Sequence, residues 1–243
     1  MALQSKHVVF DVVGTCISYE AFYDAIEARL GHKLRARSIG SRLLGYAWME
    51  AGEKEYTYLS LSGHYVVYFD VFRSIFYRTL WQAGIEEPRK FATDDDREFL
   101  LQSYRRLRPR AGLENCFSRL REAGFTVWCF TSGDVKRVSG YFASGGVDFP
   151  LENFVSCDSI GVGKPAPECY KFVLDKFPKE NCETWFAAGH MWDVAGAKRA
   201  GFKGAWVSVW EKEQCADIFG EMDVVADDLP KLADSIIAAS AKI

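Results

Sequence analysis

The sequence predicts an α/β protein: a doubly wound parallel sheet with an inserted all-helical lobe. From about residue 109 onward, apolar strand-like segments alternate with amphipathic helix-like segments, which is the pattern of βαβ units with helices on both faces of a sheet. Residues 19–105 break this rhythm, because their apolar residues recur at helical spacing without a convincing strand. We therefore expect a core formed by residues 1–18 and 106–243, with the lobe inserted after the first strand.

The first strand is predicted at residues 7–11, where a β-branched, apolar run ends in Asp11. Further strands are expected at residues 126–130, 154–155, 184–188, 204–208 and 223–225. Helices are expected at residues 113–123, 135–144, 167–176, 193–200 and 229–239. Within the lobe, residues 46–80 are dense in aromatic side chains, and at helical spacing these are more often the core of a bundle than a cofactor site.

Composition narrows the class of protein. The chain is 49% hydrophobic, which favours a packed interior over disorder. Its net charge is −3 with no basic run, so we expect no nucleic-acid partner. No apolar stretch approaches the roughly 20 residues of a membrane span, and the N-terminus runs directly into the first strand. We therefore expect a cytoplasmic protein with a small-molecule substrate and no membrane partner.

Seven scattered cysteines lack the spacing of a zinc site, and their odd number fits reduced thiols better than a disulfide framework. The oligomeric state stays open. Aromatic side chains of the lobe either pack within it or face a second subunit, which would make the protein a homodimer.

Two short polar segments follow predicted strands. Ligands of open α/β sheets bind outside the carboxyl ends of the strands, so Asp11 would lie at the mouth of a site. A desolvated carboxylate there is a nucleophile or a metal ligand, and the alternative is an aspartate that starts a turn. Residues 131–134 (Thr-Ser-Gly-Asp) follow the next strand along the chain. Their hydroxyls and amides either bind an anionic group or cap the following helix.

Two further segments follow the same pattern. Lys164 lies in a Gly-Val-Gly-Lys-Pro-Ala-Pro loop, which would hold its ammonium group more firmly than a surface loop does. The alternative is a solvated lysine. Residues 187–193 follow another strand and include His190, Trp192 and Asp193. These residues suggest a site, although a single histidine is more often structural and Asp193 could serve as a helix cap.

Taken in order, these segments resemble the haloacid dehalogenase superfamily over nearly the whole chain. The elements of the resemblance are Asp-x-x-Gly-Thr, a strand-end hydroxyl, Gly-x-Gly-Lys-Pro-x-Pro and a strand-end loop that contains Asp. The chain is most similar to the type II (S)-2-haloacid dehalogenases. Val13 stands where phosphatase members carry a second aspartate, and Tyr170 follows Lys164 by six residues, as a tyrosine does in those dehalogenases. The resemblance implies a Rossmann-like core, a helical cap and a hydrolase that needs no cofactor.

The resemblance also implies a role for each matching residue. Asp11 would be the nucleophile and form an aspartyl ester that water then hydrolyses. Thr15 and Thr131 would hydrogen-bond the nucleophile or the substrate carboxylate. Lys164 would keep Asp11 ionised, and Asp193 would orient Lys164 and help to activate water. The residues expected to contact the substrate are Val12, Arg42, Glu50, Ser132, Tyr170 and Trp192.

Several positions depart from the dehalogenase pattern. Glu50 aligns with an arginine that contacts the departing halide in those enzymes. Arg42 lies nearby in the sequence and could take the place of that arginine. Ala188 and His190 replace a serine and an asparagine of the fourth segment, and Ser132 replaces an asparagine of the second. We expect His190 to be an acid/base group, since imidazole titrates near neutral pH. These changes keep the nucleophile, alter the contacts to the leaving group and water, and weigh against simple 2-haloacids as substrates.

Two alternatives accompany this hypothesis. The first is a degenerate phosphatase, which would need Mg²⁺, although Val13 removes the usual general acid and Asp11 with Asp193 would make a poor magnesium site. The second is a non-hydrolytic relative that acts on a specialised metabolite. Under the dehalogenase-type hypothesis we expect no metal ligand.

Overall fold

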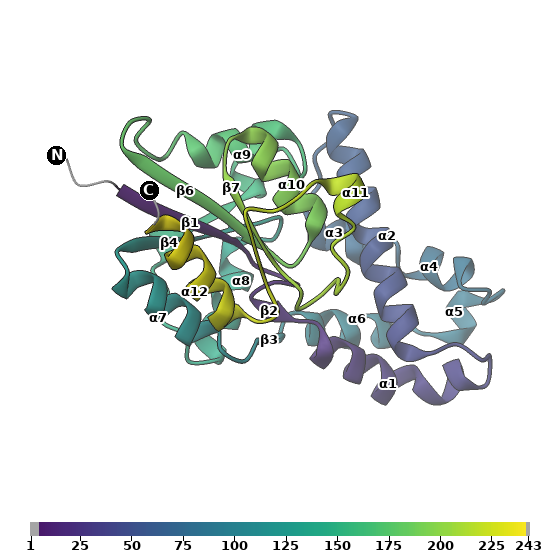
Figure 1. Ribbon diagram of the computed structural model, residues 1–243. Helices are drawn as coiled ribbons and strands as arrows, with labels where there is room; N and C mark the ends of the chain where they lie inside the picture. Colours follow the sequence, from purple (N-terminus) through teal and green to yellow (C-terminus); the bar gives the residue numbers. More distant parts are fainter. Residues whose placement is uncertain (1–4, 242–243) are drawn as a thin grey trace. The chain divides into compact units, whose positions relative to one another are not determined.

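The computed structural model describes residues 5–241 of the 243-residue chain (Figure 1). The chain divides into two compact units. The first, which we call the core unit, comprises Met1–Ser18 and Pro109–Ile243, and the second, the helical unit, comprises Tyr19–Arg108.

The core unit is built on a six-stranded sheet in the order β5-β4-β1-β6-β7-β8, and every strand pair is parallel. The strands are β1 (Ser5–Asp11), β4 (Phe125–Thr131), β5 (Phe154–Ser156), β6 (Cys182–Ala188), β7 (Lys203–Val207) and β8 (Val224–Ala226). This parallel sheet with helices on both faces confirms the predicted fold class.

Strand β1 lies at the centre of the sheet because it is apolar on both faces. Val8, Val9 and Phe10 are fully buried, and burying a side chain of this size contributes about 1.5–3 kcal/mol. The register pairs Asp11 with Phe130 of β4 and Phe10 with Ala187 of β6. The carboxyl ends of β4 and β6 therefore flank Asp11.

Helices cover both faces of this sheet. They are α7 (Leu113–Glu122), α8 (Val135–Ser144), α9 (Pro167–Leu174), α10 (Met191–Ala200), α11 (Ala216–Phe219) and α12 (Leu229–Ser240), with 3-10 turns η1 (Leu151–Asn153) and η2 (Cys157–Ser159). Figure 1 shows α9 and α10 on one face and α7 and α12 on the other. Asp134 and Asp228 cap α8 and α12 by accepting from the backbone N–H groups of Arg137 and Lys231, respectively.

The structure differs from the sequence prediction in a few elements. A two-stranded sheet of β2 (Ile17–Ser18) and β3 (Arg108–Pro109) and the short helix α11 were not predicted. Helix α10 begins at Met191 with His190 at its N-cap. The helix-cap interpretation of Asp193 is therefore wrong, because Asp193 lies inside the first turn and is fully buried.

The helical unit contains α1 (Glu20–Arg35), α2 (Ser41–Leu61), α3 (Tyr68–Ser74), α4 (Phe76–Gln82), α5 (Pro88–Phe91) and α6 (Asp94–Tyr104). Aromatic side chains form its core, as predicted. The Trp48 ring stacks on Phe72 with 4.2 Å between centroids, and its Nε1 donates to the Phe72 carbonyl at 2.8 Å. Thr93 and Asp96 form a capping box that starts α6.

No helix within residues 5–241 is long and apolar enough to cross a membrane. All seven cysteines are free thiols. Five are buried, namely Cys16, Cys116, Cys129, Cys157 and Cys169, while Cys182 is partly buried and Cys215 is exposed.

Candidate active site

Asp11 ends β1 and is held by the turn that follows it. Gly14 adopts a positive φ of 94°, which favours glycine, and this turn brings Thr15 back to the strand end. The Thr15 hydroxyl donates to Asp11 Oδ2 at 2.7 Å and accepts from the Gly189 N–H at 2.8 Å. One side chain thus ties the Asp11 carboxylate to the loop after β6.

Lys164 lies between two carboxylates. Its Nζ is 3.1 Å from Asp11 Oδ1 and 2.7 Å from Asp193 Oδ2, and it also donates to the Phe130 carbonyl at 3.1 Å. The residue is only 2% exposed. The stiff loop before α9 therefore delivers a buried ammonium group to the carboxyl end of the sheet, and the solvated-lysine alternative is wrong.

Asp193 is oriented from two directions. Its Oδ2 accepts from Lys164, and its Oδ1 accepts from the Tyr170 hydroxyl at 2.6 Å. Both Asp193 and Tyr170 are fully buried. Tyr170 therefore supports Asp193 through its hydroxyl, a contact that the sequence did not predict.

The charges of this cluster stabilise one another. Burial by itself would raise the pKa of Asp11, but Lys164, His190 and Thr15 together hold that pKa well below its usual value. Burial by itself would lower the pKa of Lys164, yet the carboxylates of Asp11 and Asp193 raise it above the ordinary lysine value. Burial also raises the pKa of Asp193. Asp11 is thus an ionised carboxylate at neutral pH, beside a protonated lysine.

His190 is a further neighbour of Asp11. Its Nδ1 lies 3.3 Å from Asp11 Oδ2, and its side chain is largely buried. Burial alone would lower the pKa of the imidazole, but the carboxylates of Asp11, Glu211 and Asp193 together raise it. The ionised Asp11 carboxylate thus favours the protonated form of the imidazole.

The loop at residues 131–134 is fixed by its own hydrogen bonds. Thr131 Oγ1 accepts from the Gly133 N–H at 3.0 Å, and Ser156 Oγ donates to the Gly133 carbonyl at 2.8 Å. A Cβ atom on Gly133 would clash with Nη2 of Arg137, so a larger residue at position 133 would displace the Arg137 side chain. Ser132 is partly buried in this loop. Asp134, and not Thr131 or Ser132, caps the helix that follows.

The other expected substrate contacts are distributed over both units. Val12 is fully buried, and its carbonyl accepts from the N–H groups of Cys16 and Ile17. Trp192 is partly buried. Together with Pro165, which precedes α9, and residues of α9, α10 and α11, it lines a surface cavity of about 370 Å³.

Arg42 and Glu50 belong to α2 of the helical unit. Arg42 donates to both carboxylate oxygens of Glu20 at 2.7 and 2.9 Å and stacks over the Tyr23 ring. Glu50 is exposed on the same helix. Arg42 thus already has a carboxylate partner within its own unit.

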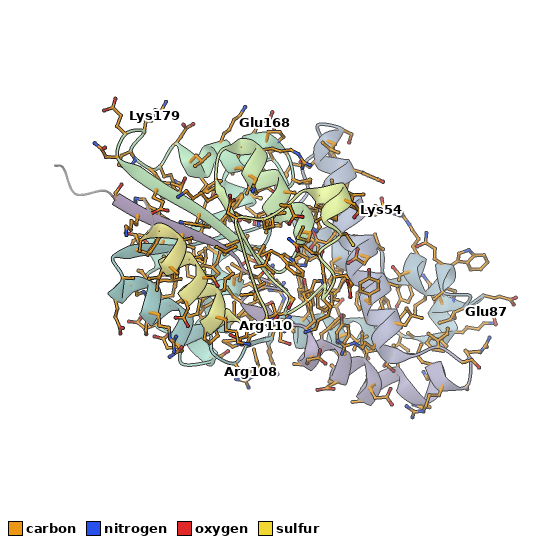
Figure 2. The ribbon with its side chains drawn as sticks, viewed as in Figure 1. Lys54, Glu87, Arg108, Arg110, Glu168 and Lys179 are labelled. Atoms are coloured by element: carbon orange, nitrogen blue, oxygen red, sulfur yellow. The ribbon has the colours of Figure 1, made fainter. Side chains whose placement is uncertain are left out.

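Several residues next to the site were not predicted from the sequence. Glu211 accepts from the Met191 N–H at 2.7 Å through Oε2, and the Trp210 ring lies 6.4 Å from the His190 ring. Both residues lie in the segment after β7, and the strand-end rule that singled out Asp11 points to this segment but not to its individual residues. Arg110, labelled in Figure 2, donates through Nε and Nη2 to the Gly14 carbonyl and holds the turn after Asp11.

The donor set around Asp11 suits a carboxylate nucleophile better than a magnesium ion. Within residues 5–241, no group of three or more His, Cys, Asp or Glu side chains could together hold a metal ion. Mg²⁺ prefers an octahedral shell of oxygen ligands, whereas Asp11 and Asp193 are bridged by the Lys164 ammonium group. The residues present therefore do not fit a magnesium site.

Fold and site together define a class of protein, a doubly wound α/β enzyme with a buried, ionised aspartate at the carboxyl end of its central strand. Comparison with known proteins gives the family. A family model described as haloacid dehalogenase-like hydrolase matches residues 5–201. This chain therefore belongs to the haloacid dehalogenase-like hydrolases.

Relatives within this family include a curated (S)-2-haloacid dehalogenase of Xanthobacter autotrophicus. It is 27% identical over 212 residues, which cover 87% of this chain and 78% of that protein. Solved structures share the fold. The L-2-haloacid dehalogenase RSc1362 has a TM-score of 0.81 at 19% identity, covering 95% of this chain and 98% of its own. The L-2-haloacid dehalogenase of X. autotrophicus with chloropropionic acid covalently bound has a TM-score of 0.74 at 21% identity, covering 96% and 98%.

Proposed function

We propose that this chain is a metal-independent hydrolase of the 2-haloacid dehalogenase type that uses Asp11 as its nucleophile. The observation that carries the proposal is the contact between Lys164 Nζ and Asp11 Oδ1, in a buried site where Thr15 holds Oδ2. Together these contacts favour an ionised, oriented carboxylate. The valine at position 13 supports this assignment over a phosphatase, because it cannot protonate a leaving group.

In the first step, a carboxylate oxygen of Asp11 attacks a carbon atom of a small organic substrate. A new C–O bond forms, the bond from that carbon to the leaving group breaks, and the leaving group departs with the bonding electron pair. Lys164 keeps Asp11 ionised for this attack, while Thr131 and Ser132 offer hydroxyl groups to the substrate. The Xanthobacter relative is an (S)-2-haloacid dehalogenase, which supports a carbon–halide or related bond as the one that breaks.

In the second step, water adds to the Asp11 carbonyl carbon and the ester splits into product and free carboxylate, so that one difficult displacement becomes two easier reactions. Asp193 holds Lys164 in place, and Tyr170 holds Asp193. We assign Tyr170 this positioning role in place of the substrate contact that the sequence predicted. His190 is the acid/base group of this step.

Turnover in oxygen-18 water tests the proposal. With bromoacetate or (S)-2-chloropropionate as the probe, peptide mass spectrometry should find oxygen-18 in the side chain of Asp11, because hydrolysis replaces one of its oxygen atoms. The Asp11→Asn variant should lose turnover. Turnover without label on Asp11 would rule out the covalent mechanism, and so would turnover that survives in Asp11→Asn.

A further inference from the structure

The segment after β7 packs against the loop that carries His190. Glu211 Oε2 accepts from the N–H of Met191, the residue after His190, at 2.7 Å. A Cβ atom on Gly189, the residue before His190, would lie 3.3 Å from Cβ of Trp210. His190 is thus enclosed by this segment while its Nδ1 lies 3.3 Å from Asp11.

Three carboxylates from different elements act on His190. Asp11 at the end of β1 lies 3.3 Å from Nδ1, Glu211 after β7 accepts from the neighbouring Met191 N–H, and Asp193 belongs to α10. The charges of all three raise the pKa of His190 against the effect of burial. The facing cation is Lys164, which contacts both Asp11 and Asp193. Alkylation of Asp11 turns its carboxylate into a neutral ester, and only the charges of Glu211 and Asp193 then favour the imidazolium.

We propose that Glu211 is a positioning residue for His190, and that esterification of Asp11 itself converts His190 from the ion-pair partner of Asp11 into the base for ester hydrolysis. The inference rests on the proposed function, since it requires an ester on Asp11. In this arrangement the base becomes available only after the intermediate has formed. While Asp11 is a free carboxylate, His190 is protonated and activates no water molecule that could compete with Asp11 for the substrate.

The protons balance over the cycle. When Asp11 loses its charge, the His190 imidazolium releases its proton to the leaving group or to solvent. Neutral His190 then takes a proton from water as the hydroxide adds to the ester carbonyl carbon. Collapse of the tetrahedral intermediate breaks the bond to the product oxygen, which takes the proton from His190. This collapse leaves Asp11 as a carboxylic acid. Its proton passes to neutral His190, which restores the ion pair between the two groups.

NMR titration of the imidazole tests the coupling without a substrate. The chain has only four histidines, so a His190→Gln spectrum identifies the His190 signals. Asp11→Asn mimics the neutral ester, and we expect it to lower the His190 pKa by about one unit or more, the effect of removing an opposite charge at this distance. Glu211→Gln should lower the His190 pKa further, in the native background and in Asp11→Asn. The matched control is Glu213→Gln, an exposed residue of the same segment.

A His190 pKa that is the same in native protein and in Asp11→Asn would overturn the inference, and so would one that Glu211→Gln leaves unchanged. The measurement in Glu211→Gln alone decides the role of Glu211 even if Asp11→Asn does not fold.

A kinetic experiment separates this inference from the proposed function. With (S)-2-chloropropionate, Glu211→Gln should slow ester hydrolysis about tenfold or more relative to ester formation, so that the Asp11 ester accumulates in the intact-mass spectrum. The pH–rate profile of ester hydrolysis in Glu211→Gln should shift in the same direction as the His190 pKa. An Asp11 ester that forms and is hydrolysed at the native rate in Glu211→Gln would contradict the role of Glu211 and leave the proposed function intact. Substrate turnover without any Asp11 ester contradicts the proposed function.

Discussion

Replacing Lys164 with methionine tests how strongly the site depends on its buried cation. Methionine keeps a flexible apolar chain, so the change removes the ammonium group and its hydrogen bonds to Asp11, Asp193 and Phe130. Because Lys164 is 2% exposed, little water can reach the two carboxylates in its place. Removing one partner of a buried ion pair costs about 3–5 kcal/mol, and we expect a loss of this size in the free energy of unfolding at pH 7.

The stability deficit of Lys164→Met should depend on pH in a definite direction. In the native protein the Asp11 pKa is lowered, so Asp11 stabilises the fold above its unfolded pKa of 3.8, and this contribution is lost as the pH falls. In Lys164→Met, burial raises the pKa of both carboxyl groups, and protonation then relieves their repulsion. The stability deficit relative to native protein should therefore shrink between about pH 7 and about pH 5.

Urea denaturation at both pH values measures the deficit. The matched control is Lys171→Met on α9, since Lys171 is exposed and makes no ion pair with any residue in the described range. A surface change of this kind should alter the free energy of unfolding by less than about 0.5 kcal/mol. A deficit below about 1 kcal/mol for Lys164→Met, or one that grows on acidification, would refute the view of Lys164 as the charge that holds the site together.

Three further predictions follow from local contacts and from the donor set. Glu183 is buried, which would raise its pKa, but Lys203 Nζ donates to it at 2.6 Å and the pKa is lowered. Glu183→Gln should therefore reduce the free energy of unfolding by about 1–3 kcal/mol at pH 7 in urea denaturation, and the difference should vanish as acid protonates the native carboxylate. Gly133→Ala must displace Arg137 and should lower the free energy of unfolding by about 1–3 kcal/mol. Gly140→Ala in α8, where a Cβ atom would meet nothing within 4 Å, should raise it by about 0.5–1 kcal/mol, and equal effects of the two substitutions would contradict the clash. Adding Mg²⁺ should release no phosphate from an aryl phosphate, and Mg²⁺-dependent release would revive the phosphatase alternative.

Much of the fold could be predicted because its signals are local. The apolar run before Asp11 can be buried on both faces only in a central parallel strand, and the alternation after residue 109 supplies the flanking helices. The meeting of Asp11, Lys164 and Asp193 follows from the same topology, since parallel strands place their carboxyl ends at one edge.

The missed features depend on tertiary contacts. Asp193 lies inside the first turn of α10, where it accepts from Lys164 and Tyr170, and local helix propensity carries no signal of such tertiary contacts. Tyr170 has the apolar spacing of an ordinary core residue, so its hydroxyl contact is invisible in the sequence. Glu211 stands in a polar, irregular stretch, where a carboxylate is usually solvated.

The buried thiols have a consequence for chemoselectivity. An enzyme that forms its intermediate by alkylation exposes its own side chains to electrophiles, and thiolates are the most vulnerable of these. Burial raises the pKa of Cys16 well above its usual value and that of Cys116 to about 12, which keeps both sulfurs protonated and unreactive. Cys215 alone is exposed. Under the proposed mechanism, reactive haloacids should therefore modify Asp11 and Cys215 while the five buried thiols survive.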